Sequence, residues 1–378
     1  MSITLADARV VTPEGVHEGW LTVEDGRITH VGRGTAPGPG HSLGGRYVVP
    51  GFVDIHCHGG AGGSFPNGDQ DEARRIAALH ARHGTTTLMA SLVTASLDDL
   101  VRATSALADL CEDGLLAGIH FEGPYISRAR CGAHDPALLR DPSPGEFAGL
   151  LAAGRGHVRM LTIAAELPGA LDTVREAAAN GVIAALGHSD ATYEQTLAGV
   201  DAGARVATHL YNAMPPLHHR KPGPIAALLE DERVTVELIN DGVHLHPAMT
   251  RLAYDVAGPA RTVLITDAMA AAGMGDGSYL LGPMKVEVTD GVARLAEGGS
   301  IAGSTLTMDV AFRRAVREAG LSMTEAAEVT ALTPARVLGL DDRLGSVSVG
   351  RQADLVVLTD DLEVAGVMRH GSWITEPR

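Results

Sequence analysis

Two histidines spaced two positions apart, His56 and His58, end an apolar run that begins at Val48. If this run is a β-strand, side chains at i and i+2 point to the same side, so both imidazoles can bind one metal ion. Polar residues end later apolar runs in the same way: Glu122, His188, His209 and Asp267. Imidazole and carboxylate groups together are a ligand set for Zn²⁺ or a related divalent ion. The recurrence predicts one metal site built from several strands.

A metal site of this kind indicates hydrolysis. A bound divalent metal lowers the pKa of a water molecule toward neutrality and supplies hydroxide as a nucleophile. Asp267 is the candidate general base, because a carboxylate beside that water can accept its proton and later return it to a leaving group. Taken singly, each residue is more often a hydrogen-bonded core or surface residue. Their joint occurrence at strand ends favours a common purpose, since isolated buried polar groups are costly.

Alternating strands and helices must bring these residues together. Apolar, β-branched runs alternate with stretches of helical length rich in Ala, Leu, Glu and Arg. The runs expected to be strands are 52–58, 84–90, 115–121, 157–163, 181–187, 205–209, 234–240 and 262–266. Eight strands followed by helices predict an α/β fold, a (β/α)8 TIM-like barrel, in which the carboxyl ends of the strands meet at one mouth.

Local signals mark helix starts and one insertion in the barrel. Ser143–Glu146 and Ser322–Glu325 have the spacing of a capping box, and Thr333-Pro334 places proline in a first helical turn. Met284–Leu295 is expected to form two strands around Asp290-Gly291, between the last barrel strand and its helix.

Both ends of the chain have the pattern of short strands. These expected strands are Ile3–Val11, Gly19–Val23, Arg27–Val31, Ala353–Leu358 and Val364–Met368. Together they predict a small β-sandwich domain made of residues 1–49 and 345–378. Residues 50–344 would then be the metal-dependent catalytic barrel.

Composition limits the partners and the compartment. Among 378 residues there are 30 Lys plus Arg and 46 Asp plus Glu, a net charge of −16, which argues against nucleic-acid and anionic-membrane surfaces. The three cysteines show no CxxC spacing, which argues against a disulfide framework. The N-terminus lacks the pattern of a signal peptide, and no run approaches the about 18 apolar residues of a membrane span. We expect a cytoplasmic protein with no nucleic-acid or membrane partner.

The residues that carry this chemistry resemble the amidohydrolase superfamily. The matching segments are Pro50–His58, His188, His209, Asp267, Thr333–Arg336 and Gly350–Leu355. Further segments resemble the N-acetylglucosamine-6-phosphate deacetylase family: His120–Tyr125, Gly132–His134, Gly187–Ser189, Thr208–Met214 and Asp241–His244. The resemblance implies hydrolysis of N-acetyl-D-glucosamine 6-phosphate to D-glucosamine 6-phosphate and acetate, in amino-sugar catabolism and cell-wall recycling.

The resemblance also implies how the metal is held. Glu122, His188 and His209 would bind the main ion, with Glu122 in place of the carboxylated lysine of many relatives. His56 and His58, with Glu122 and Asp267, would hold a second ion, as in family members that keep the histidine pair. The implied cofactor is a divalent metal, Zn²⁺ first, with one or two ions per subunit.

A further set of residues matches the segments that line the family's sugar-phosphate site. It comprises Ala133, His134, Asn212, Ala213, Arg220, Asp241, Gly242, Val243, His244, Ile301, Ala302 and Gly303. Arg220 suits phosphate because its guanidinium makes charge-assisted bidentate bonds. In the family the equivalent arginine comes from the neighbouring subunit, which implies a homodimer, and His244 would polarise the acetyl carbonyl. The alternative is that His218–Lys221 is only a solvated basic loop.

Other functions stay open at this point. Another amidohydrolase, acting on a cyclic amide or an N-acyl amino acid, would lose little on Arg220→Ala. A non-catalytic sugar-phosphate sensor would leave the substrate intact and would not need a base at Asp267. Cys131, in the loop before Gly132, approaches the metal, governs loop motion or is chemically silent.

Overall fold

The computed structural model of the chain describes residues 2–377, and these form two units. One unit contains the described parts of Met1–Asp54, Ala78–Thr87 and Thr307–Arg378, and the other contains Ile55–Ala77 and Leu88–Leu306. Within residues 2–377, no helix combines the length and the apolar character needed to cross a bilayer. The predicted division into domains at residues 49/50 and 344/345 stays a prediction.

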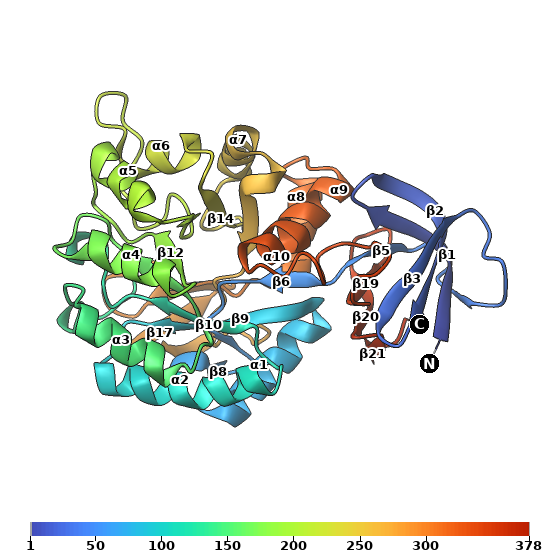
Figure 1. The fold of residues 1–378 in the computed structure, drawn as a ribbon, viewed down its shortest axis with the longest axis horizontal. Helices are drawn as coiled ribbons and strands as arrows, with labels where there is room; N and C mark the ends of the chain where they lie inside the picture. Colours follow the sequence, from blue (N-terminus) through green and yellow to red (C-terminus); the bar gives the residue numbers. More distant parts are fainter. Residues whose placement is uncertain (1, 378) are drawn as a thin grey trace. The chain divides into compact units, whose positions relative to one another are not determined.

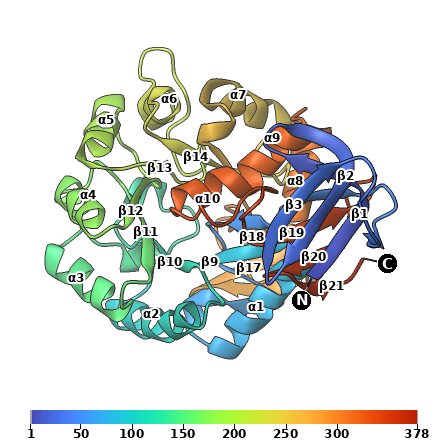
Figure 2. The ribbon, with the colours of Figure 1, turned by 45° about the vertical axis from the view of Figure 1, so that its right-hand side comes forward.

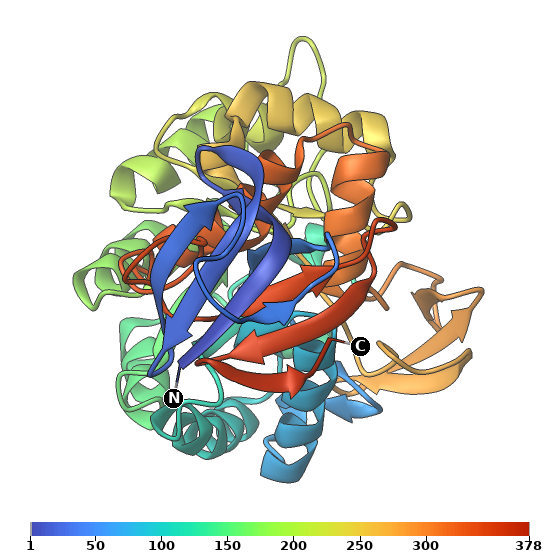
Figure 3. The same ribbon diagram turned by 90° about the vertical axis from the view of Figure 1, so that its right-hand side faces the viewer.

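Strands from both ends of the chain form one sheet, shown with blue N-terminal and red C-terminal strands side by side in Figure 3. Its strands are β1 (Ser2–Thr12), β2 (Gly15–Glu24), β3 (Arg27–Arg33), β4 (His41–Ser42), β5 (Tyr47–Pro50), β19 (Leu355–Leu358), β20 (Val364–Arg369) and β21 (Ser372–Thr375). The order is β21-β20-β19-β5-β1-β2-β3, with β4 paired to β1. Leu5, Leu21, Ile28 and Val357 are buried in its core, so apolar burial joins the two termini.

A second eight-stranded sheet forms the barrel. Its strands are β6 (Phe52–Asp54), β9 (Thr85–Val93), β10 (Gly118–Glu122), β11 (Val158–Ile163), β12 (Ile183–Leu186), β13 (Val206–Ala207), β14 (Thr235–Ile239) and β15 (Thr262–Ile265). They follow one another in chain order, and the pairs from β9 to β15 are parallel. All nine residues of β9 are buried, as expected for strands covered on both faces. The predicted (β/α)8 barrel is confirmed.

Helices alternate with these strands along the chain (Figure 1). They are α1 (Gln70–Arg82), α2 (Leu97–Glu112), α3 (Pro144–Ala153), α4 (Ala170–Ala179), α5 (Tyr193–Ala202), α6 (Gly223–Glu230), α7 (Pro247–Ala257), α8 (Met308–Arg317), α9 (Met323–Ala327) and α10 (Thr333–Val337). Helices α2 to α7 form an outer row around strands β10 to β14 (Figure 2). Between α9 and α10 the chain makes a π-helical turn, η5 (Glu328–Leu332).

Short elements complete the fold. They are β7 (Gly59–Gly60), β8 (Gly63–Ser64) and the 3₁₀ turns η1 (Phe65–Asn67), η2 (Arg128–Arg130), η3 (Pro136–Leu138) and η4 (Pro259–Arg261). The predicted insertion is present as β17 (Met284–Thr289) and β18 (Val292–Leu295), joined by a third strand, β16 (Gly277–Leu281). Most of β16 lies outside the core, which explains why its sequence carries no strand pattern.

One predicted helix cap is confirmed and one is wrong. At Ser322 the capping box forms with Glu325. At Ser143 the side chain makes no capping hydrogen bond. The Glu146 carboxylate instead accepts two hydrogen bonds, of 2.9 and 2.6 Å, from the guanidinium of Arg140. An ion pair with Arg140 therefore replaces the hydrogen bond that the Glu146 side chain would make to the N-cap main chain in a capping box.

Candidate metal centre and active site

The ends of the barrel strands position the predicted metal ligands. Glu122 is the last residue of β10. His188, His209 and Asp267 each lie two residues beyond a strand and have positive φ angles of 47°, 28° and 48°. A left-handed backbone costs about 1–2 kcal/mol at a residue with a Cβ atom. Strain at three site residues indicates that the surrounding fold imposes their orientation.

Glu122 lies at the centre of the cluster. Its Oε1 atom is 2.9 Å from His209 Nε2 and 3.1 Å from His188 Nε2, and these two nitrogens are 2.9 Å apart. Its Oε2 atom is 3.2 Å from His58 Nε2. All four side chains are buried. Residues from four strand ends thus face one another.

The opening histidine pair faces the same centre. His56 Nε2 and His58 Nε2 are 3.1 Å apart, and Asp267 Oδ1 lies 3.2 Å from His58 Nε2 and 3.6 Å from His56 Nε2. Glu122 Oε1 is 3.5 Å from His56 Nε2. The structure therefore brings together all the residues predicted as metal ligands.

Fixed hydrogen bonds define which ring nitrogen faces the cluster. Three rings donate Nδ1–H to an acceptor: His58 to the Ser91 carbonyl (3.2 Å), His188 to the Arg130 carbonyl (2.9 Å) and His56 to Glu237 Oε2 (3.1 Å). A neutral ring that is protonated at Nδ1 presents a lone pair at Nε2. Nitrogen lone pairs about 3 Å apart repel each other unless a proton or a cation lies between them. The donor set therefore fits a divalent cation.

The charges of the cluster support this fit. Burial alone would lower the pKa of His58, but hydrogen bonds to Asp267 and Glu122 raise it to about 9. Burial alone would raise the pKa of Asp267, but the hydrogen bond from His58 and the charge of His56 lower it to about 2. The protein alone thus holds a proton on His58 and negative charge on Asp267. A divalent cation would replace that proton.

His134 has a different role from the other histidines, although its Nε2 atom lies 3.2 Å from Glu122 Oε2. The Thr94 main-chain N–H donates to His134 Nδ1 (3.2 Å), which places the ring proton on Nε2. Burial lowers the pKa of His134 to about 4, so the ring is neutral. His134 Nε2–H therefore donates to Glu122 and offers no lone pair to a metal.

A cavity of about 320 Å³ opens beside the cluster. Of the predicted substrate residues it is lined by Ala133, His134, Asn212, Ala213, His244, Ile301 and Gly303. It is also lined by Gly132, from the matching segment Gly132–His134, and by two residues that the sequence did not indicate, Leu281 and Ser300. Predicted residues outside this lining are Arg220, Asp241, Gly242, Val243 and Ala302. The volume lies within the range of small-ligand sites.

Asp241 supports His244 from outside the cavity. Its Oδ2 atom is 2.7 Å from His244 Nδ1, and its Oδ1 atom accepts the main-chain N–H groups of Val243 and His244 (2.8 Å each). Burial lowers the pKa of His244, but the hydrogen bond to Asp241 outweighs it and the net shift is upward. A ring with its proton affinity raised in this way can stabilise an oxyanion at the cavity wall.

Arg220 and Cys131 do not line the cavity and belong to none of the metal-ligating groups of the described residues. Arg220 is exposed, and its guanidinium is 2.7 Å from His219 Nε2. No lysine or arginine appears among the described residues that line the 320 Å³ cavity. Cys131 is a half-buried free thiol, and it belongs to none of the clusters of metal-ligating side chains found within residues 2–377.

Two carboxylates that the sequence analysis did not single out hold the site in place. Glu237 accepts from His56, and its signal is a charged residue within the otherwise apolar end of β14. Glu166, just beyond β11, accepts from Ser189 Oγ and from the main-chain N–H of Asp190 (2.6 Å each). This ties the segment that follows His188 to the neighbouring strand.

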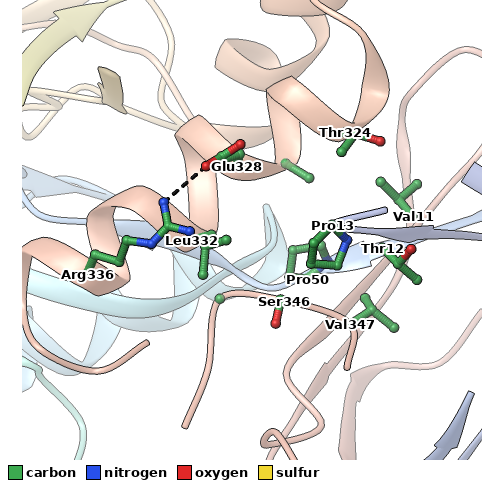
Figure 4. A pocket seen from close by; sticks show the side chains of 12 residues that line it. Val11, Thr12, Pro13, Pro50, Thr324, Glu328, Leu332, Arg336, Ser346 and Val347 are labelled. Atoms are coloured by element: carbon green, nitrogen blue, oxygen red, sulfur yellow. Dashed lines mark hydrogen bonds and ion pairs between the residues drawn. The ribbon is translucent and has the colours of Figure 1, made fainter. Parts of the chain in front are cut away.

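A second cavity, of about 220 Å³, lies within the unit that contains both termini (Figure 4). Val11, Pro13 and Leu332 form part of its apolar wall, and Arg336 donates to Glu328 at 3.0 Å beside it. Its described lining contains none of the predicted site residues and no histidine or cysteine. It offers no metal-ligating group besides Glu328.

Comparison with known proteins identifies relatives of this chain. Residues 47–374 match the Amidohydrolase family. N-acetylgalactosamine-6-phosphate deacetylase from Escherichia coli O157:H7 is 38% identical over 376 residues, covering 98% of this chain and 99% of that protein. N-acetylglucosamine-6-phosphate deacetylase from Vibrio furnissii is 36% identical over 339 residues, covering 88% and 84%.

A solved structure extends the comparison. It is an aspartate-to-alanine variant of N-acetyl-D-glucosamine-6-phosphate deacetylase from Mycobacterium smegmatis in complex with N-acetyl-D-glucosamine-6-phosphate. It is 50% identical, has a TM-score of 0.97, and covers 99% of this chain and 100% of its own. With the metal centre at its strand ends, this chain belongs to the amidohydrolase family, and within it to the N-acetylglucosamine-6-phosphate deacetylases, which are enzymes.

Proposed function

We propose that this enzyme hydrolyses N-acetyl-D-glucosamine 6-phosphate to D-glucosamine 6-phosphate and acetate, with Zn²⁺ at the metal centre. The observation that carries the proposal is the position of Asp267, which lines the cavity and lies 3.2 Å from His58 within the ligand cluster. A base and a set of metal ligands therefore border the same space. A cytoplasmic location remains part of the proposal.

Glu122, His188 and His209 would hold one divalent cation, and His56 and His58, with Glu122 and Asp267, a second. Such a cation would polarise the amide carbonyl and lower the pKa of the attacking water. Asp267 would accept the proton of the attacking water and pass it to the departing amine. His244, held by Asp241, stabilises the negative charge that develops on the acetyl oxygen.

Five of the remaining predicted substrate residues have assigned tasks in this proposal. Asn212 and Ala213 line the cavity and offer neutral hydrogen-bonding groups, while Ile301 and Gly303 form part of its wall. A phosphate also needs a cation, and the described lining supplies neither lysine nor arginine. The proposal assigns this charge to Arg220 of a second subunit in a homodimer. The exposure of Arg220 leaves it accessible for that contact.

Acetate release tests the proposed reaction. The zinc-loaded enzyme is incubated with N-acetyl-D-glucosamine 6-phosphate, with its galactosamine epimer and with unphosphorylated N-acetyl-D-glucosamine. We expect the highest kcat/KM with the first and the lowest with the sugar that lacks phosphate. Faster turnover of the epimer would move the substrate to N-acetyl-D-galactosamine 6-phosphate, the substrate named for the Escherichia coli relative. Turnover of cyclic amides or N-acyl amino acids in preference to all three would contradict the proposal.

A further inference from the structure

Glu237 of β14 links the two halves of the metal cluster. Its side chain is fully buried, and one oxygen, Oε2, accepts from His56 Nδ1 at 3.1 Å and from the main-chain N–H of His209 at 3.2 Å. His56 belongs to the opening pair, and His209 belongs to the group around Glu122. One carboxylate oxygen therefore contacts a ring on one side of the cluster and the backbone on the other.

The partner of His56 differs in kind from those of the neighbouring rings. His58 and His188 each donate Nδ1–H to a neutral main-chain carbonyl, whereas His56 donates to a carboxylate. A carboxylate fixes the tautomer and orientation of a ring and makes its other nitrogen a stronger donor toward a metal. His56 is thus held more firmly and made more basic than a carbonyl would make it.

The contact to His209 acts on a strained residue. His209 has a φ angle of 28°, which a residue with a Cβ atom adopts only when its surroundings impose it. The hydrogen bond from its N–H to Glu237 is one such constraint, and Leu210 N–H adds a second by donating to the Glu237 carbonyl at 2.8 Å. Glu237 therefore helps to fix the turn that directs the His209 ring toward Glu122.

The other oxygen of Glu237 indicates that this arrangement serves more than packing. Oε1 is buried and accepts no hydrogen bond from any residue in the described range 2–377. A buried carboxylate is unfavourable compared with an apolar residue of similar volume. The cost of burying Glu237 in the barrel must therefore be offset by a functional effect. Because Oε2 contacts His56 and His209, we place that effect at the metal cluster.

We infer that Glu237 is a positioning residue that orients His56 and the His209 turn together, so that both metal positions depend on one carboxylate. This inference rests on the proposed metal-dependent function. According to this inference, Glu237 structurally couples the opening histidine pair to the group around Glu122. Weakening the hydrogen bonds of Glu237 should then lower metal affinity at both positions, although Glu237 would contact the metal ligands and not the metal itself.

Zinc binding without substrate tests the inference. Wild type, Glu237→Gln and Glu237→Leu are compared by zinc content per subunit and by competition with a chromophoric chelator. Loss of an outer hydrogen-bond partner typically weakens metal affinity by about 10–100-fold. We expect a weakening of this size for Glu237→Gln, and a larger one for Glu237→Leu. Glu237→Gln keeps the shape of the side chain, so it remains informative if Glu237→Leu fails to fold.

Two further variants separate positioning from simple stability. Thr173→Val also removes a buried hydroxyl, which donates to the Gly169 carbonyl at 3.2 Å at the start of α4, and should leave zinc affinity unchanged. In a His56→Asn background, Glu237 still contacts the main chain of His209. Glu237→Gln should therefore still weaken binding of the remaining zinc in that background. Unchanged zinc content and affinity in both Glu237 variants, with only a lower melting temperature, would overturn the inference. Because zinc is measured without substrate, a wild-type protein that binds zinc yet releases no acetate would contradict the proposed function alone.

Discussion

At the scale of single residues, Asp267 combines two tasks that a substitution can separate. Its carboxylate is within 3.2 Å of His58 and also lines the cavity. Asp267→Asn keeps an oxygen near the metal but removes the proton acceptor. Since general acid–base catalysis contributes about 10²–10⁴-fold, kcat should fall at least about 100-fold while substrate affinity stays within a few-fold. Steady-state kinetics and calorimetric titration measure the two quantities.

Zinc content must accompany this experiment, because Asp267 is also a predicted ligand. Asp255→Asn, at an exposed position of α7, is the matched control and should keep wild-type kinetics. A zinc-loaded Asp267→Asn enzyme with kcat within tenfold of wild type would mean that another group accepts the proton.

Asp309 offers a residue-scale test of stability against pH in the other unit. It lies in the first turn of α8, and its Oδ1 atom is 3.1 Å from His83 Nδ1. Burial raises the pKa of Asp309, but the hydrogen bond to His83 and others from Thr307 and the Val310 N–H outweigh it, so the net shift is downward. A carboxylate with a folded pKa below its unfolded value of about 3.9 stabilises the fold above that value, and the contribution disappears as the pH falls through the folded pKa.

Asp309→Asn should therefore destabilise the protein by about 1 kcal/mol at pH 7, and the difference from wild type should shrink below about pH 4. Thermal unfolding at pH 7, 5 and 3.5 measures this trend. Asp342→Asn, at an exposed position, is the control and should show no such trend. A difference that grew on acidification would contradict the sign of the shift.

At the scale of elements, the capping-box spacing occurs at both Ser143 and Ser322, but only Ser322 forms the capping box. A pair of variants can compare the two helix starts. Ser322→Ala removes a capping box and should destabilise the start of α9 by about 1 kcal/mol. Ser143→Ala should change the start of α3 by less than about 0.5 kcal/mol, because Ser143 makes no capping hydrogen bond. Amide hydrogen exchange in the first turn of each helix measures the local effect. Equal protection losses at the two helices would mean that Ser143 does cap α3.

The same pair shows what local sequence can specify. The barrel strands were predictable because apolar runs such as 84–90 and 157–163 have strand length and are bounded by helical stretches. The cap at Ser143 was not, because Arg140 competes for Glu146, and β16 was not, because most of it is exposed. Tertiary neighbours decide both cases.

In the candidate site, too, some features could be predicted from local sequence and others depend on the tertiary fold. The ligands could be predicted because a polar residue that ends an apolar strand is visible in the sequence, as at Glu122. The link from Glu237 to His56 could not, because 181 positions separate them and only closure of the barrel makes them neighbours. The left-handed backbone at His188 and His209 was likewise not predicted from the sequence.

At the scale of the whole molecule, the proposed homodimer predicts that two defective variants can complement each other, which sites within a single chain could not do. If Arg220 serves the site of the other subunit, an Arg220→Ala homodimer lacks the phosphate contact at both sites, and its KM should rise strongly. An Asp267→Asn homodimer lacks the base at both sites. A mixed dimer, however, contains one site that combines Arg220 from the Asp267→Asn subunit with Asp267 from the Arg220→Ala subunit.

Co-expression of the two variants under different affinity tags should therefore restore activity that neither homodimer has. Random pairing makes about half of the dimers mixed, each with one intact site of two, so about a quarter of wild-type activity is expected at low substrate. A mixture of Asp267→Asn and His188→Asn is the control, because both residues belong to the same subunit's site, and it should recover nothing. Absence of recovery in the Arg220→Ala mixture, with mixed dimers demonstrated by tandem purification, would place Arg220 in the site of its own subunit or outside the reaction.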